Sequence, residues 1–224
     1  MRLITIRQEK GGVAKTFLTA HLVPYLHKLG HKYRPVDLDM LPGLLSKIYP
    51  DCASVSPQDS LVRSGESLLP QLMERVMEGE LFIIDCGANT GPGWEALFKV
   101  VWPTLADEMN AKGVKWTIIV PITSAEETLT NFALYKKQYP RATFILCVVR
   151  EYADEEVPLP DHPKDLVIEL PLAPGKLFSS YRKLRMPIDN MIGNTALPML
   201  SGFAKGYIPQ LHAMFKRIEP HLIP

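Results

Sequence analysis

The residues best suited to chemistry form a loop at Glu9–Thr16, which follows a short β-branched run and precedes a segment with helical spacing. Backbone N–H groups of such a glycine loop point toward a phosphate, and the following helix dipole favours its negative charge. The Lys15 ammonium would reach the β- and γ-phosphates of a nucleotide, and the Thr16 hydroxyl would bind Mg²⁺. Glu9 and Ala14 stand where the strict pattern G-x-x-x-x-G-K-[ST] requires glycine. If the backbone at Ala14 must adopt a positive φ, the alanine costs about 1 kcal/mol or more.

Apolar runs that alternate with helical segments must position this loop. Strands are expected at 2–7, 33–38, 81–85, 116–121, 143–149 and 166–170. Helices are expected at 16–29, 44–48, 67–78, 94–110, 125–138, 176–184 and 197–218. This order predicts an α/β fold, a doubly wound, mostly parallel sheet with helices on both faces. Ligands of such sheets bind at the carboxyl edge, where the loop and the acidic strand ends of Asp39 and Asp85 would meet.

Prolines are expected to disturb three of these helices, because proline removes a backbone donor and clashes with the preceding turn. Pro24 should kink the first helix or start a new turn, and Pro103 should break the helix at 94–110. Pro209 should interrupt the last helix, and Pro220 follows it. These two breaks argue against a membrane-seeking tail, so we expect no stable membrane insertion.

Composition is typical of a cytoplasmic globular protein. The 224 residues suit a single domain, 1–224. The formal net charge of +1 gives no overall attraction to a polyanionic partner, although a local basic face is compatible with it. The three cysteines are odd in number and lack metal-like spacing, which indicates a reducing compartment. Two of them, Cys86 and Cys147, end apolar runs and are expected to be buried. The N-terminus does not resemble a signal peptide, and no apolar stretch approaches the roughly 18–20 residues of a membrane span.

The segment K-G-G-V-A-K-T that starts at Lys10 resembles the K-G-G-x-G-K-[ST] loop of the ParA/MinD superfamily of P-loop ATPases with a deviant Walker A motif. Lys10 would be the additional signature lysine of that family. The residue before this lysine is often not glycine there, so Glu9 is compatible, whereas Ala14 departs from the commonest form. The run 36–39 resembles the family's second strand with its acidic pair, and 82–87 resembles its Walker B strand.

This resemblance implies ATP and Mg²⁺ as cofactors, ATP hydrolysis, and a switch between a monomer and an ATP-sandwich dimer. Phosphoryl transfer depends mostly on positioning and charge neutralisation. Lys10 would reach the partner's phosphates, and Asp39 would orient the attacking water. The implied catalytic residues are Lys10, Lys15 and Asp39, and the implied metal ligands are Thr16, Asp39 and Asp85, the last through water. The implied nucleotide contacts are Lys10, Gly11, Gly12, Val13, Ala14, Lys15, Thr16, Phe17 and, near the base, Arg150.

Within the superfamily, the segments 85–88, 115–121 and 123–149 resemble the TraL- and StbB-like ATPases of conjugative and mobilisable plasmids. That branch implies plasmid partition, stability or transfer, a DNA-binding or relaxosome partner, and nucleoid association. Non-specific DNA binding is a further expectation, against the alternative of a solvated helix face. Its candidate residues are Lys176, Arg182, Lys183, Arg185, Lys205, Lys216 and Arg217.

Two other functions remain open alongside an ATPase that acts on plasmid DNA. A weakly hydrolysing or non-hydrolysing adaptor, gated by nucleotide and bound to a partner protein, is compatible with Ala14. A small-molecule P-loop enzyme of the dethiobiotin synthetase kind is disfavoured, because Lys10 has no role in it. Asn89 and Thr90, which follow the Walker B strand, either sense the γ-phosphate or form an ordinary turn.

Overall fold

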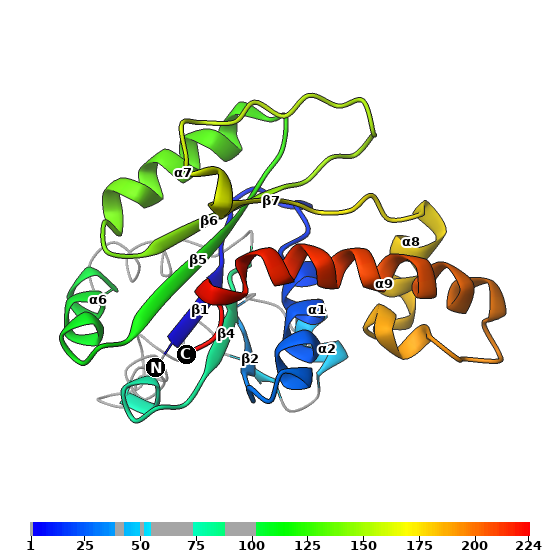
Figure 1. Ribbon diagram of the computed structural model, residues 1–224, viewed down its shortest axis with the longest axis horizontal. Helices are drawn as coiled ribbons and strands as arrows, with labels where there is room; N and C mark the ends of the chain where they lie inside the picture. Colours follow the sequence, from blue (N-terminus) through cyan, green and yellow to red (C-terminus); the bar gives the residue numbers. More distant parts are fainter. Residues whose placement is uncertain (1, 39–42, 50–51, 55–73, 88–101) are drawn as a thin grey trace.

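The computed structural model describes residues 2–38, 43–49, 52–54, 74–87 and 102–224. In this part of the chain, seven parallel strands form one sheet in the order β3-β2-β4-β1-β5-β6-β7 (Figure 1). The strands are β1 Arg2–Ile6, β2 Arg34–Asp37, β3 Ala53–Ser54, β4 Phe82–Asp85, β5 Lys115–Ile122, β6 Thr143–Val148 and β7 Val167–Glu169. The six predicted strands are confirmed, and β3 was missed because two residues carry no periodicity.

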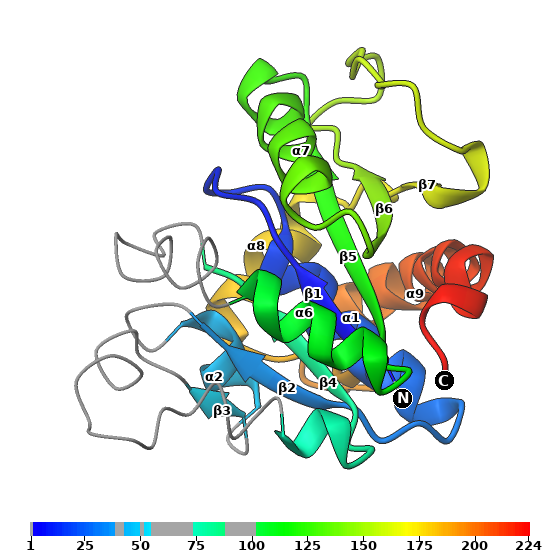
Figure 2. The ribbon, with the colours of Figure 1, turned by 90° about the vertical axis from the view of Figure 1, so that its left-hand side faces the viewer.

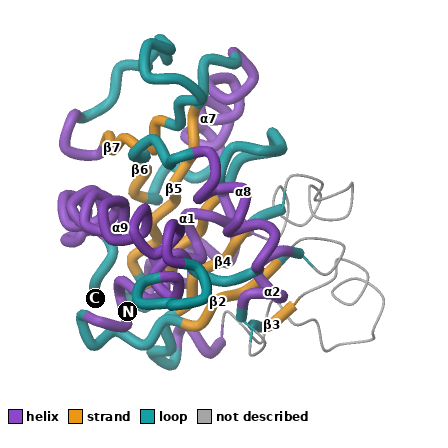
Figure 3. Tube along the Cα trace, turned by 90° about the vertical axis from the view of Figure 1, so that its right-hand side faces the viewer, coloured by secondary structure: helices purple, strands orange, loops and turns teal. Residues whose placement is uncertain are grey.

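Helices cover both faces of the sheet. The described α-helices are α1 Lys15–Lys28, α2 Leu44–Ile48, α6 Trp102–Ala111, α7 Glu126–Gln138, α8 Gly175–Leu184 and α9 Pro198–Ile218. Short 3₁₀ turns are η2 Lys164–Leu166, η3 Ile188–Met191 and η4 Glu219–His221. Figures 1 and 2 show α6 and α7 on one face, and Figure 3 shows α1, α2, α8 and α9 gathered on the other. The predicted doubly wound α/β fold is confirmed.

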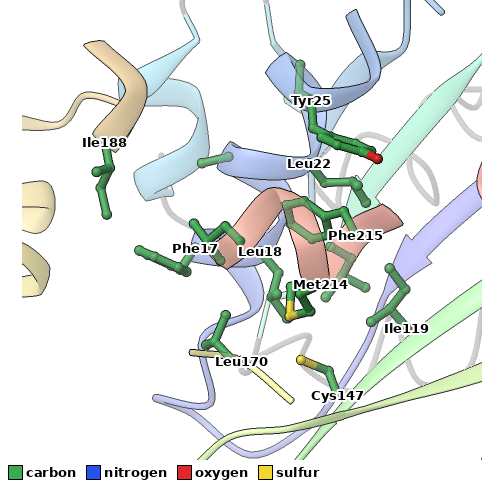
Figure 4. Packing of buried hydrophobic residues seen from close by; sticks show 14 of the residues in the cluster. Phe17, Leu18, Leu22, Tyr25, Ile119, Cys147, Leu170, Ile188, Met214 and Phe215 are labelled. Carbon is green, nitrogen blue, oxygen red and sulfur yellow. The ribbon is translucent and has the colours of Figure 1, made fainter. Parts of the chain in front are cut away.

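Each central strand supplies apolar side chains to two separate cores. On β1, Ile4 and Ile6 pack toward α1, whereas Leu3 packs toward α6 and α7. On β5, Ile119 joins the first of these cores and Ile118 the second. Because successive side chains point to opposite faces, a strand buried on both sides reads as a continuous apolar run. Figure 4 shows the core on the α1 side.

Register aligns the carboxyl ends of three strands. Ile6 of β1 pairs with Asp85 of β4, and Asp85 in turn pairs with Asp37 of β2. After β1 the chain builds β2, β3 and β4 on one side, and then β5, β6 and β7 on the other. The carboxyl end of β1 is therefore the switch point at which open α/β sheets bind their ligands.

Helices α1 and α9 each continue through an internal proline. Helix α1 runs through Pro24, and the Ala20 carbonyl, four residues earlier, accepts a hydrogen bond from the Tyr49 hydroxyl at 2.7 Å. Tyr49 thus replaces the donor that proline lacks. Helix α9 continues through exposed Pro209, where water can serve the freed carbonyl. Pro103 lies within α6, and residues 94–101 of the predicted helix lie outside the described residues.

The cysteine prediction is confirmed. Cys86 and Cys147 are buried, and both are free, as is half-buried Cys52. Burial raises the pKa of the Cys86 and Cys147 thiols to about 12, so neither is a thiolate at neutral pH. Within the described residues, no helix has the length and hydropathy needed to cross a membrane.

Candidate functional site

The loop between β1 and α1 turns through two residues with left-handed backbone. Gly12 has φ 77°, and Ala14 has φ 64° and ψ 19°. Ala14 is also the N-cap of α1, and its carbonyl accepts the Leu18 N–H at 2.9 Å. The conformation that made alanine costly at this position is therefore present, at about 1–2 kcal/mol for a residue with a Cβ. The loop therefore turns into α1 through a left-handed residue at Ala14, where the glycine pattern has a glycine.

The three residues after Ala14 lie in different environments at the start of α1. Lys15 is buried, and its ammonium donates to the Lys10 carbonyl at 2.8 Å. Thr16 is half-buried in the first turn of α1. The Phe17 side chain packs in the core on the α1 side (Figure 4), so the side chain itself is unsuited to a ligand contact. Only the Phe17 backbone N–H remains suited to the contact that was predicted.

A cleft of about 1060 Å³ opens at the carboxyl edge, beside this loop. Its volume suits a nucleotide-sized ligand, since small-molecule sites measure roughly 300–1,000 Å³. Residues 10–14 form one wall, and the other walls come from 123–125 after β5, 149–151 after β6 and 170–173 after β7. The fold thus brings Arg150 into the same cleft as the loop, as the sequence predicted, although 136 residues separate Arg150 from Ala14.

Ion pairs hold two cations at the cleft. The Lys10 ammonium lies 3.8 Å from a Glu127 carboxylate oxygen on α7, with both side chains partly exposed. The Arg150 guanidinium lies 3.3 Å from a Glu169 oxygen on β7. Exposed pairs of this kind contribute roughly 0–1 kcal/mol, so a ligand phosphate could displace either carboxylate.

A carboxylate closes one side of the cleft. Glu155 accepts hydrogen bonds from the Ser124 hydroxyl and from the Glu151 N–H, each at 2.5 Å. The hydrogen bond from Ser124, followed by that from Glu151, lowers the pKa of Glu155. The segment after β6 is thereby tied to the loop after β5, and the two form a continuous wall.

The two acidic strand ends differ in what the structure shows of them. Asp85 is buried at the end of β4, in the same row as the end of β1. Asp39, Asn89 and Thr90 lie outside the described residues. Asp37, which the sequence paired with Asp39, is buried and accepts the Ser46 N–H at 3.0 Å and the Ser46 hydroxyl at 2.8 Å.

Gly43 completes the environment of Asp37. A Cβ at Gly43 would lie 2.5 Å from a carboxylate oxygen of Asp37, far too close for any other residue. Asp37 therefore anchors the start of α2 to the end of β2, at the position where the chain leaves toward Asp39. This anchoring function was missed by the sequence, in which Gly43 and Ser46 carry no distinctive signal.

Gln8, immediately before the loop, forms a buried clasp to α7 that was also missed. Its side-chain amide donates to the carbonyls of Pro121 and Thr128, each at 3.1 Å. Its side-chain oxygen accepts from the Asn131 amide at 2.7 Å and from the Glu9 N–H at 3.0 Å. A polar residue between an apolar strand and the loop was the available signal, but its partners cannot be read from the sequence.

The other side of the loop rests on α8 through an aromatic contact. The Tyr181 and Phe17 rings meet edge to face at 5.1 Å, and the Tyr181 hydroxyl donates to the Thr16 carbonyl at 3.3 Å. Buried His21 lies one turn after Phe17 and accepts the Ile188 N–H on Nε2 at 3.0 Å. Its Nδ1 lies 2.7 Å from the Phe17 carbonyl, which assigns the proton to Nδ1 and keeps the ring neutral.

The predicted DNA-binding cations are spread over α8 and α9. The side chains of Lys183, Arg185, Lys205, Lys216 and Arg217 are exposed, whereas those of Lys176 and Arg182 lie outside the described set. Arg217 donates to the Val167 carbonyl at 3.2 Å, and Lys183 lines the cleft. The structure leaves DNA binding as a prediction.

No family model matches the chain, and no curated protein matches it. Among solved structures, the MinD cell division protein of Aquifex aeolicus is similar over 100% of this chain and 99% of its own, with TM-score 0.53 and 17% identity. The MinD protein of Pyrococcus horikoshii, complexed with Mg-ADP, covers 92% and 96% with TM-score 0.49 and 16% identity. Cobyrinic acid a,c-diamide synthase of Mycobacterium smegmatis covers 83% and 93% with TM-score 0.43 and 17% identity. The chain has the fold of the Aquifex MinD protein.

Proposed function

We propose that this protein is an ATPase that binds ATP and Mg²⁺ in the cleft at the carboxyl edge. The observation that carries the proposal is the loop itself, whose left-handed turns at Gly12 and Ala14 precede the N-terminus of α1 and border the cleft. A helix N-terminus behind such a loop is a binding site for phosphate. The likeness to MinD over the whole chain supports this choice of site.

The donor set fits Mg²⁺, which prefers hydroxyl and carboxylate oxygens together with water. Thr16 begins α1, Asp85 ends β4 beside β1, and Asp39 follows Asp37 by two residues. In the proposed site these three residues hold the metal, which neutralises phosphate charge. Lys15 exchanges its bond with the Lys10 carbonyl for the β- and γ-phosphates, and Asp39 orients the attacking water. Arg150 contacts the base end of the nucleotide.

The proposed function extends to an ATP-dependent homodimer that positions, stabilises or helps to transfer plasmid DNA through a DNA-binding or relaxosome partner. Lys10 supports the dimer, because its ion pair with Glu127 is weak enough to yield to a phosphate across the interface. The exposed cations Arg185, Lys205 and Lys216 support non-specific binding to DNA. The resemblance to TraL- and StbB-like ATPases supports the plasmid role.

Nucleotide binding and light scattering test the proposal. The wild type should bind ATP with Mg²⁺, hydrolyse it, and approach twice the monomer mass with a non-hydrolysable analogue. Lys15→Ala should weaken ATP binding by about tenfold to a hundredfold, since charge-assisted bonds contribute roughly 1.5–3 kcal/mol. Lys10→Ala should keep ATP binding and lose the dimer, and Lys28→Ala, on the far end of α1, is the matched control. If the wild-type protein bound no ATP in the presence of Mg²⁺, the proposal would be refuted.

The nucleotide-gated adaptor remains the second candidate, and the strained backbone at Ala14 is what favours it. Ala14 lines the cleft, and strain in the turn that it forms would slow turnover more than binding. ATP turnover with and without DNA distinguishes the two functions. Nucleotide-dependent association without hydrolysis in either condition would establish the adaptor.

A further inference from the structure

Three cationic side chains line the cleft, and only two of them have ion-pair partners. Lys10 pairs with Glu127 and Arg150 pairs with Glu169. Lys183, the third, has no ion pair or side-chain hydrogen bond with any of the described residues. An ammonium without a carboxylate partner beside an anion-binding loop is available to a ligand anion.

Helix α8 determines where along the cleft Lys183 lies. Gly175, at the start of the helix, lines the cleft next to the segment that follows β7. Lys183 lines it eight residues later, about 12 Å along the helix axis. Between them, Tyr181 contacts Thr16 and Phe17 in the first turn of α1. The helix therefore runs from the β7 end of the cleft to the beginning of α1, and Lys183 is at the phosphate end.

We propose that Lys183 is a further nucleotide-binding residue, which contacts the phosphates of the bound nucleotide from α8. This inference rests on the proposed function, because it takes a nucleotide as the ligand of the cleft. A lysine ammonium is a compact charge on a flexible four-carbon stem, and it suits phosphate oxygens that lie beyond the reach of the loop amides.

From the sequence, Lys183 is a candidate for non-specific binding to DNA. Its position in the wall of the cleft favours the nucleotide, because the loop residues Gly11, Gly12 and Val13 line the same cleft. Lys137 is also exposed, lies on α7 and does not line the cleft, so it provides a matched control.

Titration of the full-length chain with ATP, ADP and AMP in the presence of Mg²⁺ tests this assignment. Lys183→Gln should weaken ATP binding by about tenfold, and AMP binding by less than about twofold. Lys183→Arg, which keeps the charge, should recover most of the ATP affinity. Lys137→Gln should bind all three nucleotides as the wild type does. Unchanged thermal melting of Lys183→Gln would show that the exposed substitution leaves the fold intact.

Each other outcome overturns the assignment in a distinguishable way. If the wild type binds ATP and Lys183→Gln binds it equally well, Lys183 is not a phosphate contact, and the proposed function is unaffected. If Lys183→Gln loses retention on DNA but keeps ATP affinity, the residue belongs to a DNA surface. If the wild type binds no nucleotide, the proposed function fails, and this inference fails with it.

Discussion

The two sides of the loop at residues 10–16 are held by different kinds of interaction. Toward α7, the chain before the loop is fixed by polar contacts, in which the buried amide of Gln8 bonds to Pro121, Thr128 and Asn131. Toward α8, the chain after the loop is held mainly by ring packing, in which Phe17 meets the Tyr181 ring at 5.1 Å, with one hydrogen bond from the Tyr181 hydroxyl to the Thr16 carbonyl. The first side is defined by directional bonds and the second by shape.

This difference separates what each side controls. Hydrogen bonds to backbone carbonyls fix the position of the strand end from which the loop departs, and breaking them leaves buried groups unpaired. Aromatic packing joins α8 to α1, and within it His21 accepts the Ile188 N–H in its neutral form. Acid should therefore weaken the α8 side and leave the α7 clasp unchanged.

The largest expected effect is loss of stability in acid through His21. Burial lowers the pKa of this imidazole to about 4, against the opposing hydrogen bond to the Phe17 carbonyl and the charge of Asp189, while His212 lowers it further. The unfolded chain takes up the proton first, near pH 6.5, so the contribution is complete above that pH and is lost as pH falls toward 4. The loss amounts to about 3 kcal/mol. Urea unfolding at pH 7.5 and pH 4.5 measures it.

Replacement of the histidines isolates this contribution from the carboxylates. His21→Gln should be less stable than the wild type at pH 7.5 and should show the smaller decline toward pH 4.5. His31→Gln, in the half-buried turn after α1, should decline as the wild type does. An identical decline in wild type and His21→Gln would contradict the neutral buried assignment.

The next effect concerns the clasp to α7. Gln8→Ala should lower the free energy of unfolding by about 2 kcal/mol, because the Asn131 amide and two buried carbonyls lose their partner. Asn131→Ala removes one of the same bonds, so the double variant should lose less than the sum, by about 1 kcal/mol. Denaturant unfolding of the four proteins measures the coupling. Gln210→Ala, at an exposed position of α9, should change stability by less than about 0.5 kcal/mol. Strict additivity of the Gln8 and Asn131 substitutions would argue against a clasp.

Sequence patterns predicted the parts of this molecule that depend on local chemistry. The apolar runs identified six strands, and the glycines and lysines of residues 10–16 identified the loop. The interruption predicted at Pro209 was wrong, and α1 likewise continues through Pro24, because local rules assume that a freed carbonyl stays unpaired. At Pro24 the missing donor comes from Tyr49, which is 29 residues from the carbonyl that it serves.

The supports of the loop could not be predicted, because they join residues far apart in the chain. Gln8 bonds to Thr128 across 120 positions, and the Ile188 N–H reaches His21 across 167. A buried glutamine or histidine has many satisfactory partners, and only the strand order selects among them. Arg150 could be named because its place at a strand end is local, and its contact with a nucleotide stays a prediction. The place of Lys183 in the cleft depends on the path of α8, which no local pattern gives.

The smallest effect tests the turn that lies between the two sides. Ala14→Gly removes strain of about 1–2 kcal/mol at φ 64° and adds roughly 0.5–1 kcal/mol of unfolded-state entropy, so it should stabilise the protein by about 0.5–1 kcal/mol. Gly12→Ala, at φ 77° with open space around a Cβ, should destabilise it by a similar amount. Gly202→Ala, within α9, should instead stabilise, since a helix favours alanine. Thermal melting should resolve these as shifts of about 1–4 °C. If Ala14→Gly melted below the wild type, a contact of the Ala14 methyl group would outweigh its backbone strain, and the alanine would be a stabilising part of the loop.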